Sequence, residues 1–248
     1  MLVRYLSFAS GIIKTLILWL GLTTTANACR ELVDALKSGP NWSHIAQHHP
    51  RIKGAPARVK AAVSVIVREH QDQVEFLMMQ RAFHENDPWS GQMAFPGGKV
   101  EVSDQNPRAA AMRETAEEVG IELSRQDYVG QLNDLYGFKH EGIYVAHISS
   151  FVFRAPENCV IKPNYEVADT VWLPFSHLED PLNFQILEQP RSGIPDMPAI
   201  TINPVKQQVL WGLSLRIVLM MYDLLEQPLA ALSPEIKAQF REIEAQEV

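Results

Sequence analysis

Cysteine is scarce in this chain of 248 residues, which contains only Cys29 and Cys159. Two cysteines exclude a disulfide framework and a zinc site built from several thiolates. Apolar runs long enough for a membrane helix are also missing. Thr15–Leu22 is shorter than a membrane span, and Arg216 and Asp223 interrupt the other long apolar segment.

No block of basic residues is present either. The chain has 22 Lys and Arg against 29 Asp and Glu, which gives a formal net charge of −7. This balance argues against diffuse binding to a nucleic acid backbone. An anionic substrate would meet a repulsive average field, so it needs local cations such as a bound metal and a few Lys or Arg. We therefore expect a small-molecule partner and no nucleic acid.

The apolar content is sufficient for a substantial core, since the chain is 46% hydrophobic and 21% charged. Pattern and composition divide it into a signal-like segment at 1–28, an N-terminal helix and linker at 29–58, the main domain at 59–228 and a short helical tail at 229–248. The main domain is predicted to contain strands at Lys60–Arg68, Val74–Gln80, Tyr128–Leu135, Tyr144–Arg154 and Asp169–Leu173, a broken hairpin from Phe184–Glu188 and Ala199–Ile202, and a helix at Val205–Leu225. Surplus apolar surface on that last helix indicates deep burial or a homodimer contact.

The segment Pro107–Val119 is predicted to be a helix. Asn106 can cap its N-terminus, Pro107 suits the first helical position, and Gly120 can end the helix with a positive φ. One apolar stripe is expected from residues that recur at helical spacing, namely Ala109, Met112, Ala116 and Val119.

Glu114, Glu117 and Glu118 share another face of this helix, because they stand at positions i, i+3 and i+4. Crowded carboxylates repel one another, but Mg²⁺ or Mn²⁺ prefers hard oxygen ligands and would reverse that repulsion. A solvated acidic face is the alternative. Because Gly97-Gly98 brings bare backbone beside the same face, we favour a metal site that also uses the Gly98 carbonyl.

The stretch from Gly98 to Ile121 resembles the Nudix box, the signature of hydrolases that cleave nucleoside diphosphates linked to another moiety. The second half of the box is matched position for position by Arg113-Glu114, Glu117-Glu118 and Gly120-Ile121. Asp104 stands where a Glu is usual, and one extra residue separates it from Arg113, which is similar to the coenzyme A pyrophosphatase branch. The resemblance implies an α+β Nudix fold, with a mixed β-sheet sandwiched between helices (α/β/α), and hydrolysis that depends on Mg²⁺ or Mn²⁺.

A second stretch, which ends in Phe95-Pro96-Gly97-Gly98, resembles an additional signature of the same branch. Arg81-Ala82 and Gly91 match it, so Arg81 is a candidate substrate-binding residue. The second Arg of the signature is absent, because Asn86 or Asp87 occupies that area. The substrate class that this resemblance implies is coenzyme A or its derivatives.

The resemblance also implies roles for individual residues. Glu114, Glu117 and Glu118 would hold the metal. Arg113 stands four residues before Glu117 and would fix the rotamer of that ligand through a salt bridge. Glu166 begins a Glu-Val-x-x-x-x-Trp pattern that is similar to the last core strand of the family. It is a candidate fourth carboxylate, as metal ligand or general base, or else an ordinary surface acid.

A glycine-bounded loop from Tyr136 to Gly142 offers further candidates. Tyr136 has an aromatic surface for a base, Lys139 has a charge for a phosphate, and His140 is able to act as a general base. A solvated hairpin tip is the alternative.

Several functions agree with these residues. For coenzyme A, the resemblance implies the products 4′-phosphopantetheine and adenosine 3′,5′-bisphosphate. ADP-ribose, NADH or a nucleoside triphosphate are alternative substrates. A non-catalytic Nudix-shaped nucleotide-binding regulator ranks below the enzyme because all three carboxylates of the box are retained, and the absence of a basic run disfavours RNA decapping.

Residues 1–28 have the form of a secretory signal. Arg4 supplies positive charge, an apolar run follows, and Ala26-Asn27-Ala28 resembles a signal-peptidase site. Export or membrane anchoring through this segment is one interpretation, and the other is that the segment is not part of the working protein. A hydrolase of cytoplasmic metabolites has little use for export, so we expect a cytoplasmic protein.

Overall fold

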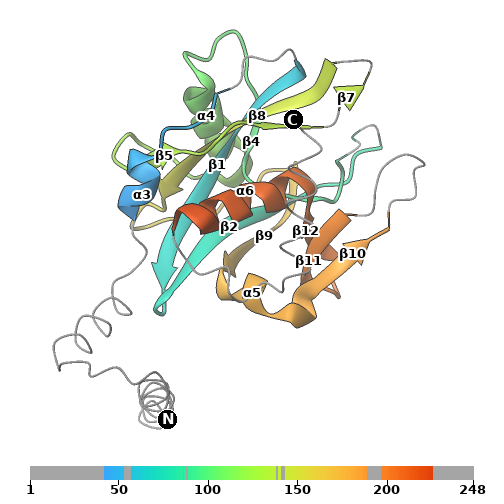
Figure 1. The fold of residues 1–248 in the computed structure, drawn as a ribbon. Coiled ribbons are helices and arrows are strands. Elements are labelled where there is room, and N and C mark those ends of the chain that lie inside the picture. The colour runs from blue at the N-terminus through green and yellow to red at the C-terminus, as the bar shows by residue number, and fades with distance from the viewer. Residues whose placement is uncertain are drawn as a thin grey trace, which may run out of the picture. The chain divides into compact units, whose positions relative to one another are not determined.

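The computed structural model describes residues 42–52, 57–85, 87, 89–137, 139–140, 143–188 and 197–225 (Figure 1). The chain divides into two compact units, Met1–Gly39 and Pro40–Val248, and the described residues belong to the second. The signal-like segment, the helix expected shortly after it and the helical tail all lie outside the described residues. Within the described ranges, no helix is both long enough and apolar enough to cross a membrane.

A mixed β-sheet forms the centre of the second unit (Figure 1). In the described ranges its strands are β1 (Ala57–His70), β2 (Gln73–Arg81), β3 (Met93–Ala94), β4 (Gly97–Lys99), β5 (Tyr128–Gln131), β6 (Leu135–Tyr136), β7 (Lys139–His140), β8 (Ile143–Arg154) and β9 (Val167–Pro174). The main path of paired strands is β3–β2–β1–β8–β5. Beside this path, β4 pairs with β1, β6 and β7 pair with β8, and β9 pairs with β2. β1 and β8 are parallel, and the other pairs are antiparallel.

The hairpin of β1 and β2 is longer than predicted and its turn is shorter. The turn consists of Gln71 and Asp72, whose φ angles are 50° and 60°. Two successive positive φ angles are typical of a type I′ turn, which matches the twist of the flanking strands. The two strands therefore extend the sheet almost to the tip of the hairpin.

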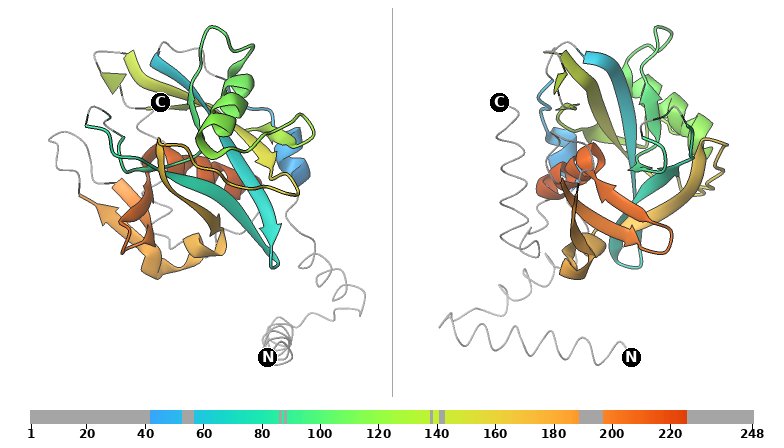
Figure 2. Two further views of the ribbon diagram at one scale, coloured as in Figure 1. Left: turned by 180° about the vertical axis from the view of Figure 1, so that it is seen from behind. Right: turned by 90° about the vertical axis from the view of Figure 1, so that its right-hand side faces the viewer.

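Helices cover both faces of this sheet (Figure 2). They are α3 (Trp42–Gln47), α4 (Pro107–Val119) and α6 (Gly212–Leu224). The side chains of β1 divide between two cores, because Ala62 and Ile66 pack in the core beneath α4, whereas Val65 and Val67 pack with α3 and α6. The predicted α+β class and the arrangement of a mixed sheet between helices are confirmed.

A second, smaller sheet precedes α6. The strands β10 (Phe184–Leu187), β11 (Met197–Asn203) and β12 (Gln208–Trp211) pair antiparallel in that order, after the short helices α5 (Ser176–Glu179) and η1 (Pro181–Asn183). The pairing of β10 with β11 confirms the predicted hairpin. The helix predicted from Val205 is wrong at its start: Gln207 has a φ angle of 55°, which a helix does not allow, and β12 follows it, so that α6 begins only at Gly212.

The apolar surface of α6 is largely used within the chain. Its buried residues are Leu215, Ile217, Val218, Met221 and Tyr222. Deep burial therefore accounts for most of the surplus apolar surface that the sequence shows in this helix.

Two further local predictions differ from the structure. The segment predicted to be a linker contains the helix α3. This helix packs on the sheet through Ile45, which is wholly buried. The strand predicted at Tyr128–Leu135 breaks into β5 and β6. Asp134 lies at the break, where its carboxylate accepts a hydrogen bond from Ser149 Oγ at 2.9 Å and lies 2.8 Å from His147 Nε2.

Candidate active site

The helix α4 begins and ends where the sequence predicts. Asn106 Oδ1 accepts a hydrogen bond from the Ala109 N–H at 3.0 Å, and Gly120 follows the last turn with φ 69°. The predicted apolar stripe is confirmed only at Val119, which is buried, and at Met112, which packs against the core; the other residues that α4 buries are Ala110, Ala111, Thr115 and Glu118. The Thr115 hydroxyl lies 2.8 Å from Ser64 Oγ of β1, so a face of small and hydrogen-bonded residues approaches the sheet. This rotation of the helix turns Glu118 toward the sheet.

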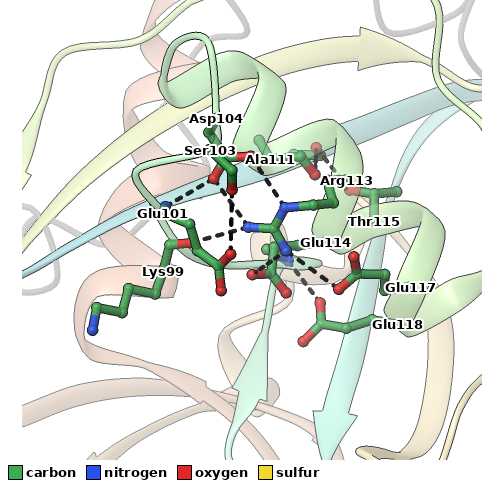
Figure 3. A network of polar contacts seen from close by, with 12 residues as sticks. Lys99, Glu101, Ser103, Asp104, Ala111, Arg113, Glu114, Thr115, Glu117 and Glu118 are labelled. Carbon is green, nitrogen blue, oxygen red and sulfur yellow. Dashed lines mark hydrogen bonds and ion pairs between the residues drawn. The ribbon is translucent and has the colours of Figure 1, made fainter.

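Arg113 lies at the centre of a polar network (Figure 3). Its Nε and Nη2 donate to the two carboxylate oxygens of Asp104, each at 3.1 Å. Its Nη1 donates to Glu114 at 2.9 Å and to Glu117 at 3.3 Å, and its Nη2 also reaches the Lys99 carbonyl at 3.3 Å. The Asp104 hydrogen bond is the largest cause of the raised pKa of Arg113, and it lowers the pKa of Asp104. Arg113 thus contacts Glu117 as predicted, but Asp104 is its main partner.

Glu118 is the buried member of the trio, with 3% of its surface exposed. The Gly97 N–H donates to its Oε2 at 2.8 Å. Burial raises the pKa of Glu118 to about 8; the charges of Glu114 and Glu166 act in the same direction, while the Gly97 hydrogen bond and Arg81 oppose them. A buried carboxylate among other carboxylates is unfavourable unless a cation comes close.

The glycine pair of β4 lets the backbone approach these acids. A Cβ on Gly98 would lie 2.5 Å from the carboxyl carbon of Glu114. Gly97 has φ 149°, and a Cβ there would lie 2.3 Å from the Ala62 carbonyl oxygen of β1. Gly97 therefore requires glycine to keep the strands together, whereas a side chain at Gly98 would displace the Glu114 carboxylate from its present position.

Glu166 lies within electrostatic range of the trio. Its charge contributes to the raised pKa values of Glu114 and Glu118, although burial is the largest cause for both. The end of the β2–β9 pairing places it there, because the Ala82 N–H donates to the Glu166 carbonyl oxygen at 2.7 Å. The charge of the predicted fourth carboxylate therefore acts on two glutamates of α4, Glu114 and Glu118.

These residues fit a hard divalent cation by their chemistry. The cluster offers carboxylate oxygens, and the burial of Glu118 disfavours its charge without a counter-ion. In the described part of the chain, no three His, Cys, Asp or Glu side chains already converge as a ligand set. Glu117 faces Arg113 and Glu118 faces Gly97 in this conformation.

Arg81 is held by an acid of the following loop. Its Nε and Nη2 donate to Asp87 Oδ2 at 3.1 Å and 2.7 Å, and the Trp89 N–H donates to Asp87 Oδ1 at 3.0 Å. Arg81 also lowers the pKa of Glu118, so it lies near the acid cluster. Asp87 occupies the area where the resemblance expects a second Arg, and there it neutralises Arg81.

Of the substrate-binding residues predicted in the stretch from Tyr136 to Gly142, the structure describes the side chain of Tyr136, in β6. Tyr136 is 5% exposed, and its ring stacks on His147 with centroids 4.7 Å apart and planes 4° apart. It does not present the open aromatic surface predicted for a base. Lys139 and His140 form β7 beside β8, and only their backbone is described.

Two functional contacts were missed by sequence reasoning. Asp104 was noted only as a departure from the Nudix box, and Asp87 only as an acid where a base was expected. Both departures signalled a charge partner for an arginine. The set of Asp134, His147 and Ser149 gave no signal, because Asp134 lies between β5 and β6 while its two partners are on β8.

Comparison with known proteins decides the family. The sequence profile of the NUDIX domain matches residues 58–192, more than half of the chain. The chain belongs to the Nudix family. The predicted family is thereby confirmed, and the predicted enzyme class agrees with the Nudix hydrolases among its relatives.

Two curated proteins illustrate these relatives. "Uncharacterized protein C14C4.10c" of Schizosaccharomyces pombe is 32% identical over 154 residues, which cover 54% of this chain and 47% of that protein. "Uncharacterized Nudix hydrolase NudL" of Yersinia pestis is 27% identical over 183 residues, which cover 72% of this chain and 85% of that protein. The matched part of this Nudix chain thus spans about half the length of the first relative and most of the second.

Two solved Nudix structures are similar in part. The NUDIX domain of Shewanella oneidensis NrtR, complexed with ADP ribose, is 18% identical to this chain with a TM-score of 0.39. The matched region covers 56% of this chain and 85% of the NrtR chain. A NUDIX hydrolase from Alicyclobacillus acidocaldarius is 17% identical to this chain with a TM-score of 0.42. The matched region covers 51% of this chain and 83% of that hydrolase. Family membership rests on the sequence match.

Proposed function

We propose that this Nudix protein hydrolyses the pyrophosphate bond of a nucleoside diphosphate linked to another moiety. In this proposal Glu114, Glu117 and Glu118, together with the Gly98 carbonyl, hold Mg²⁺ or Mn²⁺. The observation that carries it is that Glu114 and Glu118 of α4 lie against the glycine pair of β4, with Glu166, just before β9, within electrostatic range of both. When bound, the cation supplies neutralisation of phosphate charge and a more acidic water.

The residues of the chain have separate tasks in this reaction. The Gly97 N–H fixes the orientation of the Glu118 carboxylate. Arg113 restricts the rotamers of Glu114 and Glu117 through its two hydrogen bonds, and so positions ligands without touching the substrate. Glu166 accepts the proton of the attacking water.

Coenzyme A or a derivative is the proposed substrate. The support is the spacing of Asp104 and the Gly91–Gly98 stretch, which resemble the coenzyme A branch. One observation favours ADP-ribose or NADH as the second candidate. Asp87 neutralises Arg81, which leaves less positive charge for the additional phosphate of coenzyme A.

The test is an assay of the purified full chain with Mn²⁺ against coenzyme A, an acyl-coenzyme A, ADP-ribose, NADH and a nucleoside triphosphate. Glu117→Gln and Glu118→Gln should each lower turnover by about 10³-fold, because each removes a charge that the metal needs. Circular dichroism should remain that of the wild type. Glu157→Gln, at an exposed acid outside the cluster, is the matched control and should keep full activity. Near-normal turnover in either box variant would refute the proposal.

We further propose that the protein acts in the cytoplasm on a soluble small molecule. The alternative is export or membrane anchoring, for which residues 1–28 would act as the signal. Fractionation of cells that express the full chain decides between the two, because a functional signal would place the protein in the membrane or the exported fraction.

A further inference from the structure

Most of the positive charge beside the acid cluster is already in use. Arg113 is paired with three acids, and Arg81 is paired with Asp87. Lys99 pairs with Ala61 of β1, and its ammonium group points away from the glutamates of α4 (Figure 3). The whole chain carries a formal net charge of −7, so a substrate with two phosphates needs a further cation at the site.

Lys60 of β1 is an exposed cation beside this cluster. Its carbonyl accepts a hydrogen bond from the N–H of Val100, the residue directly after β4, at 2.9 Å. Two residues further along β1, Ala62 pairs with Gly98, against which the Glu114 carboxylate lies. From the spacing of paired strands, the Cα atoms of Lys60 and Gly98 are about 8 Å apart.

The side chain of Lys60 lies on the face of β1 that carries α4. Ala62 packs in the core beneath α4, and the Ser64 hydroxyl donates to the Ala111 carbonyl of α4 at 3.1 Å. The register of β1 with β8 is unbroken from Val59 to Val67, so alternate residues of this stretch share one face. Lys60 is two residues before Ala62, which places it on the same side of the sheet as the acids of α4.

The charge of Lys60 is not neutralised by an acid of the described residues. Within that part of the chain, its side chain forms no hydrogen bond and no ion pair. Its neighbour on β8 is His147, and the acid beside His147 is Asp134. The Asp134 carboxylate already lies 2.8 Å from His147 Nε2 and accepts from Ser149 Oγ at 2.9 Å. The ammonium group of Lys60 is therefore available to an anion.

We propose that Lys60 binds a phosphate of the substrate at the acid cluster. The inference rests on the proposed function and adds the cation that opposes the charge of the phosphates, in place of the neutralised Arg81. Lysine is a compact charge on a flexible four-carbon stem, so it is able to reach a phosphate held over a backbone about 8 Å away. The contact involves only the phosphate, and it applies equally to coenzyme A, ADP-ribose and NADH.

The experiment measures binding of methylenediphosphonate to the full chain by calorimetry in the presence of Mn²⁺. Lys60→Met keeps an apolar stem and removes the charge, so it should weaken binding about tenfold. Lys60→Arg keeps a positive charge and should bind within about threefold of the wild type. Lys162→Met is the matched control, because it removes the charge of another exposed lysine, beyond the end of α4, and should bind as the wild type does.

Steady-state kinetics gives a second readout. A contact that is equally strong in the bound substrate and in the transition state changes KM and leaves kcat unchanged. Lys60→Met should therefore raise KM for the hydrolysed nucleotide about tenfold and keep kcat within about twofold of the wild type. Thermal unfolding of every variant should match the wild type, because both lysines are exposed.

Each result decides a separate point. Equal binding of methylenediphosphonate by Lys60→Met and Lys162→Met would overturn the phosphate contact, and so would a wild type that does not bind this probe with Mn²⁺. A wild type that binds the probe in the expected pattern but hydrolyses no nucleotide would overturn the proposed function and keep the phosphate contact. Hydrolysis with an unchanged KM in Lys60→Met would do the reverse.

Discussion

At the scale of single residues, the site depends on how a few charges are paired. Arg113 is shared by Asp104, Glu114 and Glu117, whereas Arg81 is held by Asp87. The first arrangement holds three carboxylates around one guanidinium and so restricts their orientations. The second withholds a positive charge that a phosphate would otherwise attract.

Asp104→Asn tests the Arg113 contact through its pH dependence. The folded-state pKa of Asp104 lies below its ordinary value of 3.8, mainly because of the Arg113 hydrogen bond. A lowered carboxyl pKa stabilises the fold above pH 3.8, and that stability is lost as the pH falls through the folded-state pKa. We expect the variant to be about 1 kcal/mol less stable at pH 7, a modest value for a partly exposed pair. The difference should shrink toward pH 3 in urea unfolding, and a constant difference would contradict the role of the charge.

Asp87→Asn tests whether Asp87 restrains Arg81. The Asn side chain can still accept the Trp89 N–H, but it no longer neutralises the guanidinium. We expect KM for the nucleotide substrate to fall about threefold, because Arg81 becomes available to a phosphate. Steady-state kinetics measures this, and a rise in KM would mean that Asp87 orients Arg81 for the substrate instead.

At the scale of elements, the ends of α4 were predictable, whereas its buried face and the start of α6 were not. The ends of α4 are set by Asn106 and Gly120, which act on their own neighbours in the sequence. Its buried face is set by contact with β1 and β4, which the sequence of the helix alone does not encode. β12 was missed for a different reason: its short apolar run fits the first turn of a helix as well as it fits a strand.

The strand β4 offers a matched pair of substitutions. Gly98→Ala places a methyl group against the Glu114 carboxylate and should lower turnover about 100-fold with little change in stability. Gly97→Ala places one against the backbone of β1 at a positive φ, so it should cost about 3 kcal/mol or more in stability. Thermal unfolding and activity assays separate the two effects. Equal losses of stability would contradict the distinct roles of the two glycines.

At the scale of the whole second unit, the two sheets are joined by buried polar contacts. Gln208 of β12 is 2% exposed, and its amide donates to Asp169 Oδ2 of β9 at 2.7 Å and to Gln80 Oε1 of β2 at 3.2 Å. Sequence patterns predicted both sheets in outline. They did not predict this connection, because its partners are far apart in the chain.

Gln208→Ala tests how strongly the sheets depend on each other. Removing the amide takes one donor from Gln80 Oε1 and one from Asp169 Oδ2, which keeps Lys206 as a partner, so we expect a loss of about 1 kcal/mol in the free energy of unfolding. Urea unfolding should remain a single transition with an unchanged m-value. Two separate transitions would show that the smaller sheet unfolds independently.

The Asp104–Arg113 contact also explains how a departure from the family pattern is tolerated. Aspartate is one methylene shorter than the usual glutamate, and the loop before α4 is one residue longer than in the general box. The two changes compensate, because the longer loop delivers the shorter side chain to the same guanidinium, where both of its oxygens bind. Either change without the other is therefore expected to misplace the Asp104 carboxylate, and Arg113, which also holds Glu114 and Glu117, would lose its main partner.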